Sequence, residues 1–340
     1  MYKMAENTYS SVTETIFSDL NHSNFSVNFS TPPIIFVCGG PMTQVAASVR
    51  ERVFAYFAKD TTSNITDHLI AAEDFKDYFK DGAYDDLMEF EDDIASISTL
   101  VVIFLESAGS LVELGLFCNR IELKDRLIVF VPAEELEAKE DNEPAYSSFI
   151  YLGAIQSLKR RNDTSVMIYP WANTESITYD ELEFVVSDIK DKLGKVKKTD
   201  KFDVKNSGHM SYLIHDIIRL CEPIKLSEIE MALICLEIDY PTRNVTKCLY
   251  LLEKFKLVSP YEYSGSKYYY VNDESLSKIK FGKSRKGKVL DAPNLKMEIR
   301  SSFNPVFMKT EDEKEIEIAK KRFNALKRIV QIRKANDKSI

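Results

Sequence analysis

Two glutamates in the segment of residues 106–115 have a spacing suited to chemistry on a sugar. The segment follows the apolar run Leu100–Leu105, which predicts a strand buried on both faces, and it leads into a helical pattern over Leu111–Ile121. Glu106 lies on the predicted turn, and Glu113 follows about one helical turn later. Both carboxylates can therefore converge at the strand end, one as nucleophile and the other as a group that positions the sugar.

The backbone around this space is suited to holding hydroxyl or anionic oxygens. Gly109 allows close approach of the main chain, and a helix that starts at Ser110 presents unpaired N–H groups. The Gly39-Gly40-Pro41 turn follows the strand Ile34–Cys38 and forms the opposite lip of the site. The predicted substrate-binding residues are Gly39, Gly40, Pro41, Ser107, Gly109 and Ser110.

A purely structural interpretation of the same residues is equally consistent with the local pattern. Ser110 and Glu113 have the spacing of a capping box, in which both side chains only satisfy the backbone at a helix start. Glu106 also fits an ordinary solvated turn residue, and paired glycines occur in many α/β turns. The pattern alone leaves the choice between cap and catalyst open.

The surrounding elements predict an α/β protein with a parallel, Rossmann-like sheet. Further strands are predicted at Leu127–Val131 and Ser165–Tyr169, and helical patterns at Thr43–Phe57 and over residues 67–98, with Tyr78 and Phe79 on the apolar face of the latter. We expect an N-terminal arm over residues 1–31 and a catalytic domain over 32–193. The polar stretch 194–208 is typical of a linker.

The C-terminal third has a different pattern. Three helices followed by a hairpin over residues 209–275 predict a winged helix-turn-helix, and residues 276–340 form a basic extension with a long helix over Glu311–Lys334. DNA-binding and protein-docking interpretations both remain open for such a module. The predicted DNA-binding residues are Arg243, Asn244 and Lys247 on the third helix, and Lys283, Arg285, Lys286 and Lys288 in a loop.

Composition supports this division. Residues 241–340 contain 23 Lys+Arg and 12 Asp+Glu, which gives a net charge of +11. The net charge of the whole chain is −8, so residues 1–240 carry a net charge of −19. A basic end on an acidic chain indicates a polyanionic partner for that end. The five cysteines and four histidines form no ligand motif, so we expect no metal. Without an apolar leader or membrane span, a cytoplasmic protein is expected.

Two segments together carry a family resemblance. Residues 36–41 (FVCGGP) and 89–117 (EFEDDIASISTLVVIFLESAGSLVELGLF) resemble the nucleoside deoxyribosyltransferase-like superfamily and, more closely, the effectors of type II retrons. The resemblance covers residues 32–170, and the domain order over 207–275 extends it. It implies retaining displacement at an anomeric carbon, with Glu113 as nucleophile. Ser107 stands where such transferases commonly carry Asp, and Glu106 is expected to take over that role.

The resemblance also implies a biological setting. The chain would be the toxic effector of an antiviral retron, bound to the retron reverse transcriptase and its multicopy single-stranded DNA, with the long helix available for higher-order assembly. A nucleotide such as NAD would be the substrate, and no cofactor is expected. The alternative is a winged-helix transcriptional regulator that senses a nucleotide without catalysis. A nucleophilic Glu113 distinguishes the two, because a sensor needs only the turn.

Overall fold

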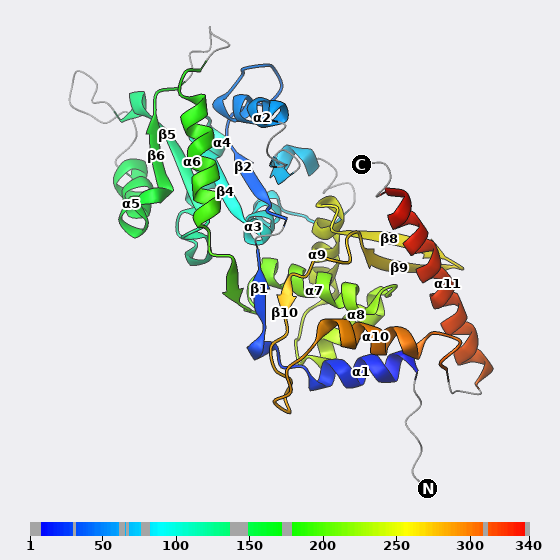
Figure 1. Ribbon diagram of the computed structural model, residues 1–340. Helices are drawn as coiled ribbons and strands as arrows, with labels where there is room; N and C mark the ends of the chain where they lie inside the picture. The colour runs from blue at the N-terminus through cyan, green and yellow to red at the C-terminus, as the bar shows by residue number, and fades with distance from the viewer. Residues whose placement is uncertain are drawn as a thin grey trace. The chain divides into compact units, whose positions relative to one another are not determined.

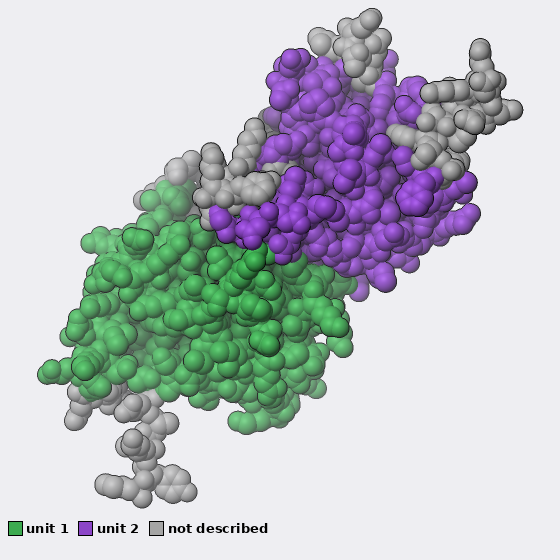
Figure 2. Space-filling model, turned by 180° about the vertical axis from the view of Figure 1, so that it is seen from behind, with its two compact units in different colours: residues 1–28, 199–340 green, residues 29–198 purple. Residues whose placement is uncertain are grey.

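The computed structural model describes residues 8–29, 32–60, 65, 68–75, 82–136, 149–171, 179–308 and 312–336. The chain forms two compact units, shown in green and purple in Figure 2. Unit 1 comprises residues 1–28 and 199–340, and unit 2 comprises residues 29–198. Each unit is described by itself.

Unit 2 is built on a five-stranded sheet in which every strand pair is parallel (Figure 1). The strand order is β3-β2-β4-β5-β6. Because β3 lies on one side of β2 and β4 on the other, the chain reverses its direction of progress between β2 and β4, the topological switch point of the sheet. The predicted parallel sheet is therefore confirmed. The strands are β2 (Ile35–Cys38), β3 (Leu69–Ile70), β4 (Leu100–Phe104), β5 (Leu127–Pro132) and β6 (Val166–Tyr169).

Helices cover both faces of this sheet. Val53 and Phe57 of α2 share a buried cluster with Val185 and Ile189 of α6. This cluster also contains Ile35 and Val37 of β2. On the opposite face the ring of Phe36 lies 6.2 Å from that of Phe117 in α4. The α-helices of unit 2 are α2 (Val49–Lys59), α3 (Leu87–Ile97), α4 (Ala108–Phe117), α5 (Gln156–Arg161) and α6 (Leu182–Lys195). A π-helix spans Phe149–Ile155, and 3-10 turns span Ala72–Phe75, Ile121–Leu123, Ala133–Glu135 and Asp163–Ser165.

The helical predictions over Thr43–Phe57 and over residues 67–98 differ from the structure of unit 2. The first helix begins at Val49 instead of Thr43, because the Ser48 side chain accepts the N–H of Glu51 and caps it there. The single helix expected over 67–98 is replaced, within the described residues, by β3, a 3-10 turn and α3. Tyr78 and Phe79 lie outside the described residues.

Unit 1 is mainly helical and contains the predicted succession of three helices and a hairpin. Its first helix, α1, lies beside α10 (Figure 1). Its helices are α1 (Tyr9–Asp19), α7 (Ser207–Cys221), α8 (Leu226–Cys235), α9 (Thr242–Lys254), α10 (Ala292–Ser302) and α11 (Glu313–Asn336), with a 3-10 turn at His22–Asn24. Strands β8 (Val258–Tyr263) and β9 (Ser266–Val271) form the hairpin, and β1 (Ser26–Asn28), β7 (Thr199–Lys201) and β10 (Ile279–Lys280) form an antiparallel sheet.

The predicted arm and linker are instead integral parts of the units. Phe17, Leu20 and Phe25 are buried, and the Tyr9 hydroxyl donates to the carbonyl of Cys221 at 3.0 Å. Strand β1 pairs with both β7 and β10, so the N-terminal segment is fixed by residues that follow it by more than 170 positions. Unit 2 therefore ends at Lys198, and the linker expected over 194–208 contains β7 and the start of α7.

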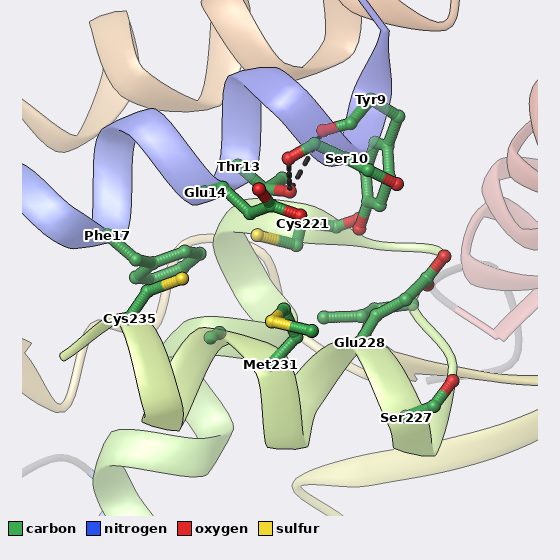
Figure 3. Close-up of a pocket in the computed structure, with 12 residues that line it drawn as sticks. Tyr9, Ser10, Thr13, Glu14, Phe17, Cys221, Ser227, Glu228, Met231 and Cys235 are labelled. Atoms are coloured by element: carbon green, nitrogen blue, oxygen red, sulfur yellow. Dashed lines mark hydrogen bonds between the residues drawn. The ribbon is translucent and has the colours of Figure 1, made fainter. Parts of the chain in front are cut away.

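A partly open cavity of about 230 Å³ lies between α1 and α8. In Figure 3, Thr13 and Phe17 of α1 face Met231 and Cys235 of α8 across it, with Glu228 at one end.

A buried ionic group, here called the Glu222 cluster, joins α10 and α11 to the hairpin. Glu222 is 0% exposed and accepts from Lys296 and Arg300 at 3.1 Å each, from Arg333, and from the main chain of Val271. Glu274 accepts from the same three side chains. Although burial acts to raise the pKa of Glu274, Lys296 and the two arginines lower it to about 2. Glu274 is therefore ionised and paired at neutral pH.

Candidate active site at the switch point

The candidate active site lies where the carboxyl ends of β2 and β4 meet. This is the position at which open parallel sheets bind ligands, because the connections from the two strands leave toward opposite faces. Helices α2 and α4 both begin at this edge, capped by Ser48 and Ser107. The loop after β2 contains Gly39 and Gly40, and the loop after β4 contains Glu106.

Helix α4 begins earlier than the sequence predicts. Ser107 is its N-cap and accepts the N–H of Ser110 at 3.1 Å, while the Ser110 hydroxyl accepts the N–H of Ser107 at 3.1 Å. The capping box is therefore Ser107–Ser110, and the predicted Ser110–Glu113 box is wrong. Gly109 lies in the first turn of the helix, exposed, and it is not the turn residue that the prediction required. Because Ser107 and Ser110 satisfy the helix start, Glu113 is not used in a cap.

Glu113 is a half-buried carboxylate with few hydrogen bonds. Its side chain has a hydrogen-bond contact with the thiol of Cys38 at the end of β2, but its Oε2 atom is buried without a hydrogen-bond partner in the described structure. Burial, reinforced by the negative charge of Glu91, raises the pKa of Glu113 to about 7. The raised pKa brings the titration of Glu113 into the neutral pH range.

Three further side chains share the electric field around Glu113. The guanidinium of Arg50, which is 2% exposed, pairs with Glu73 and also donates to the carbonyl of Val37 at 3.4 Å. Burial and then Glu73 raise the pKa of Glu91, while Arg50 opposes them. We call Cys38, Arg50, Glu73, Glu91 and Glu113 the Glu113 cluster. Since Glu73 is 51% exposed, the cluster extends to solvent.

Glu106 is held by main-chain donors. Its carboxylate accepts main-chain N–H groups from Gly40 at 2.9 Å, Val49 at 2.7 Å and Arg50 at 3.1 Å. Burial raises the pKa of Glu106, and the three N–H donors act to lower it. The side chain thus ties the end of β4 to the loop after β2 and to the start of α2.

The two glycines of that loop are explained by Glu106. A Cβ at Gly39 would lie 2.9 Å from Glu106 Oε1, and one at Gly40 would lie 2.8 Å from the Ser48 Cβ. Glycine is needed at both positions because the Glu106 carboxylate and the Ser48 side chain pack directly on the main chain. Pro41 is exposed, and its carbonyl accepts from the Ser48 hydroxyl at 2.9 Å.

The sequence does not single out four residues of this cluster as site residues: Cys38, Arg50, Glu73 and Glu91. The available signals were the acidic run that contains Glu91 and an arginine in the first turn of a helix that leaves the switch point. Neither signal specifies which face of its helix the side chain occupies. Their gathering around Glu113 depends on tertiary packing of α2 and α3.

The predicted nucleic-acid residues are divided by the structure of unit 1. Arg243 is exposed and Asn244 is half-buried, but Lys247 is only 4% exposed. Lys247 lies one turn before the buried Leu251, on the packed side of α9, so the prediction that it is exposed is wrong. The four basic residues of the loop are exposed, although Arg285 donates to the carbonyl of Leu20 and to Glu237.

The residues that the structure describes contain neither a metal-binding cluster nor a membrane-spanning helix. Within them, no group of three or more His, Cys, Asp or Glu side chains could hold a metal ion. No helix of the described chain is both long and apolar enough to cross a membrane.

Comparison with known proteins gives concordant matches. The family model described as "STM3845 retron effector protein" matches residues 46–260. An Escherichia coli protein named "Retron Ec73 putative ribosyltransferase/DNA-binding protein" is 25% identical over 211 residues, covering 57% of this chain and 64% of that protein. Another, named "Retron Ec86 putative ribosyltransferase/DNA-binding protein", is 30% identical over 134 residues, 39% of each chain. The chain thus spans less than two thirds of either relative.

Proposed function

The chain belongs to the STM3845 retron effector family, and from that premise we propose that unit 2 breaks the N-glycosidic bond of a nucleotide with Glu113 as nucleophile. The observation that carries the proposal is the carboxylate of Glu113, which lies at the switch point, is not used in a helix cap, and has a buried oxygen without a partner. A group held in this way is available for bonding to a substrate. The names of the two relatives support ribosyl chemistry, and we assign unit 2 to the nucleoside deoxyribosyltransferase-like fold.

The reaction divides the roles among the cluster. A Glu113 oxygen attacks the anomeric carbon, and the electron pair of the C–N bond leaves with the base. Glu91, whose pKa is raised, donates a proton to a base that needs one. Water then attacks the anomeric carbon of the ribosyl ester, transfers a proton to the carboxylate of Glu91 and releases Glu113. Glu91 is a carboxylate at this step because it has protonated the base or, for a base that needs no proton, because it enters the reaction ionised. Arg50 favours the ionised form of Glu113 throughout.

NAD is the substrate that we propose. Its nicotinamide is bound as a cation and leaves as a neutral base without a proton, so bond cleavage requires chiefly an ionised nucleophile. Glu106 supports the site by holding the first turn of α2, from which Arg50 extends, and we no longer assign it to the sugar.

For unit 1 we propose nucleic-acid binding. The order α7, α8, α9 followed by the β8–β9 hairpin fits a winged helix-turn-helix, and the relatives are named as DNA-binding. Arg243 and the loop lysines Lys283, Lys286 and Lys288 are the proposed phosphate contacts, since all are exposed. The partner would be the retron single-stranded DNA with its reverse transcriptase, and the assembled complex would control a toxic activity.

The catalytic proposal is tested by base release. The purified chain, alone and with its reverse transcriptase and single-stranded DNA, is incubated with NAD and a panel of nucleotides, and released bases are separated by chromatography. We expect free nicotinamide from the wild type and none from the Glu113→Gln variant. If no nucleotide is cleaved under any of these conditions, the nucleotide sensor without catalysis is the better description.

The nucleic-acid proposal is tested by fluorescence anisotropy of the full chain with single-stranded and hairpin DNA over a salt series. Changing Lys283, Lys286 and Lys288 together to Gln should weaken binding and flatten the plot of log affinity against log salt by about two to three units. A matched control changes the exposed Lys159, Arg160 and Lys195 of unit 2 to Gln. Equal losses in both triple variants would contradict the assignment to this loop.

A further inference from the structure

A cavity of about 390 Å³ lies at the same edge of the parallel sheet, on another side of α4. Its lining comes from the ends of three adjacent strands and from the first turns of α4: Leu105, Glu106, Ser107, Leu111, Pro132, Glu134, Glu135 and Trp171. Leu111 and Glu113 are separated by about 200° around the helix axis. The cavity that Leu111 lines is therefore distinct from the Glu113 cluster, where Glu113 meets Cys38.

The walls of this cavity combine flat apolar surface with carboxylates. Leu105, Leu111, Pro132 and the indole of Trp171 supply the apolar part, and three glutamates supply the acidic part. Among the described residues, the lining contains no lysine or arginine. Such a surface repels phosphate and favours a neutral or cationic ligand that donates hydrogen bonds.

Trp171 is fixed at its main chain. Its N–H donates to the Glu134 carboxylate at 3.2 and 3.3 Å, and part of its side chain packs on the hydrophobic core. Its indole Nε1 is buried without a hydrogen-bond partner in the described structure. A ring held at its backbone beside the cavity is suited to stacking on a planar ligand.

We propose that this cavity binds a planar heterocycle, neutral or cationic and bearing N–H donors, stacked on Trp171 with its donors directed at Glu134 and Glu135. The volume lies in the range of about 300–1000 Å³ that is usual for small-molecule pockets. A free base or a ring of the nicotinamide type fits this chemistry, and a phosphate group does not. The site stands on the cavity alone and does not depend on the role proposed for Glu113.

Fluorescence gives a direct test, because Trp171 is the only tryptophan of the chain. The full chain is titrated with adenine, with N1-methylnicotinamide and with AMP, and tryptophan emission is recorded. We expect saturable quenching by the two rings, and AMP to bind at least about tenfold more weakly than adenine because its phosphate meets the carboxylates. Glu134→Gln with Glu135→Gln should remove most of the preference for the cationic ring.

Variants separate this cavity from the Glu113 cluster. Leu111→Lys places a long cation in the cavity and should abolish quenching, whereas Glu113→Gln should leave it unchanged. Calorimetry with Trp171→Ala, whose fold is checked by circular dichroism, should give at least about a tenfold loss of affinity. The proposal is overturned if no ring causes saturable quenching, if quenching survives Leu111→Lys, or if it is lost in Glu113→Gln.

Discussion

The Glu113 cluster of unit 2 and the Glu222 cluster of unit 1 use similar residue types to opposite effect. In the Glu222 cluster, two carboxylates meet three cations, and all four carboxylate oxygens have partners. In the Glu113 cluster, three carboxylates share the field of Arg50, and Oε2 of Glu113 has no partner within the described residues. Burial is common to both clusters, so pairing makes the difference.

The two clusters consequently differ in protonation. The cations lower the pKa of Glu274 to about 2 against the effect of burial, whereas burial and Glu91 raise that of Glu113 to about 7. A paired cluster holds elements together but leaves no carboxylate oxygen free to react. An underpaired cluster costs stability and retains a group that can react near neutral pH. The comparison assigns packing to the first cluster and chemistry to the second.

The largest expected effect is on turnover. Glu113→Gln should lower base release by at least about 10³-fold, because an amide cannot form the covalent ribosyl ester. Release of nicotinamide from NAD measures it, with the exposed Glu183→Gln on α6 as the control for a lost carboxylate. Wild-type turnover in Glu113→Gln would contradict the assignment of chemistry to the Glu113 cluster.

The next effect concerns folding. Glu222→Gln should destabilise the protein by about 3 kcal/mol, because it removes the fully buried one of the two anions that pair with three partly buried cations. Glu274→Gln should cost about 1 kcal/mol, since that side chain is 33% exposed. Urea denaturation of both variants measures the difference. A Glu222→Gln protein as stable as the wild type would show that pairing does not hold α10 and α11 in place.

A smaller effect is expected in the pH dependence of turnover. Since the nucleophile must be ionised, kcat/KM for NAD should fall about tenfold per pH unit below the Glu113 pKa of about 7 and level off above it. Glu91→Gln removes a neighbouring negative charge, so the midpoint should move to lower pH. A midpoint that stays in place would exclude Glu91 from the field of Glu113.

The smallest effect is a gain in stability. Ionised Glu113 destabilises the folded state, because its folded pKa is above the unfolded value of 4.5. This cost develops between pH 4.5 and 7 and is complete above pH 7. Glu113→Gln should therefore be more stable than the wild type by on the order of 1–2 kcal/mol at pH 8, and the gain should shrink at pH 5. Thermal unfolding of the variant and the wild type at pH 5 and pH 8 measures this gain. A gain that is larger at pH 5 than at pH 8 would contradict the prediction.

The sequence was most informative where one local pattern determines the structure. The apolar runs predicted strands β2, β4, β5 and β6 because a buried parallel strand is apolar on both faces. The start of α4 was misplaced because Ser107 and Ser110 are both good caps, and the sequence does not reveal which one the chain uses.

The candidate site was only partly predictable for a related reason. Glu113 was identified, but Glu106 bonds to Gly40 across 66 positions and Arg50 reaches Glu73 across 23. No periodicity encodes which polar atoms meet at such separations. The burial of Lys247 could not be predicted from the local sequence either, because it depends on what packs against α9.

Unit 2 is synthesised between the two segments of unit 1, because it is inserted after residue 28. The chain leaves unit 1 after Asn28 and returns at Thr199, and these two residues face each other in the β1–β7 pairing. During synthesis, α1 emerges about 200 residues before α8, a delay of roughly 10–40 s at about 5–20 residues per second. Unit 2 is complete before that delay ends. On the proposed assignment, a nascent chain therefore carries its reactive unit before the unit that binds the nucleic acid exists.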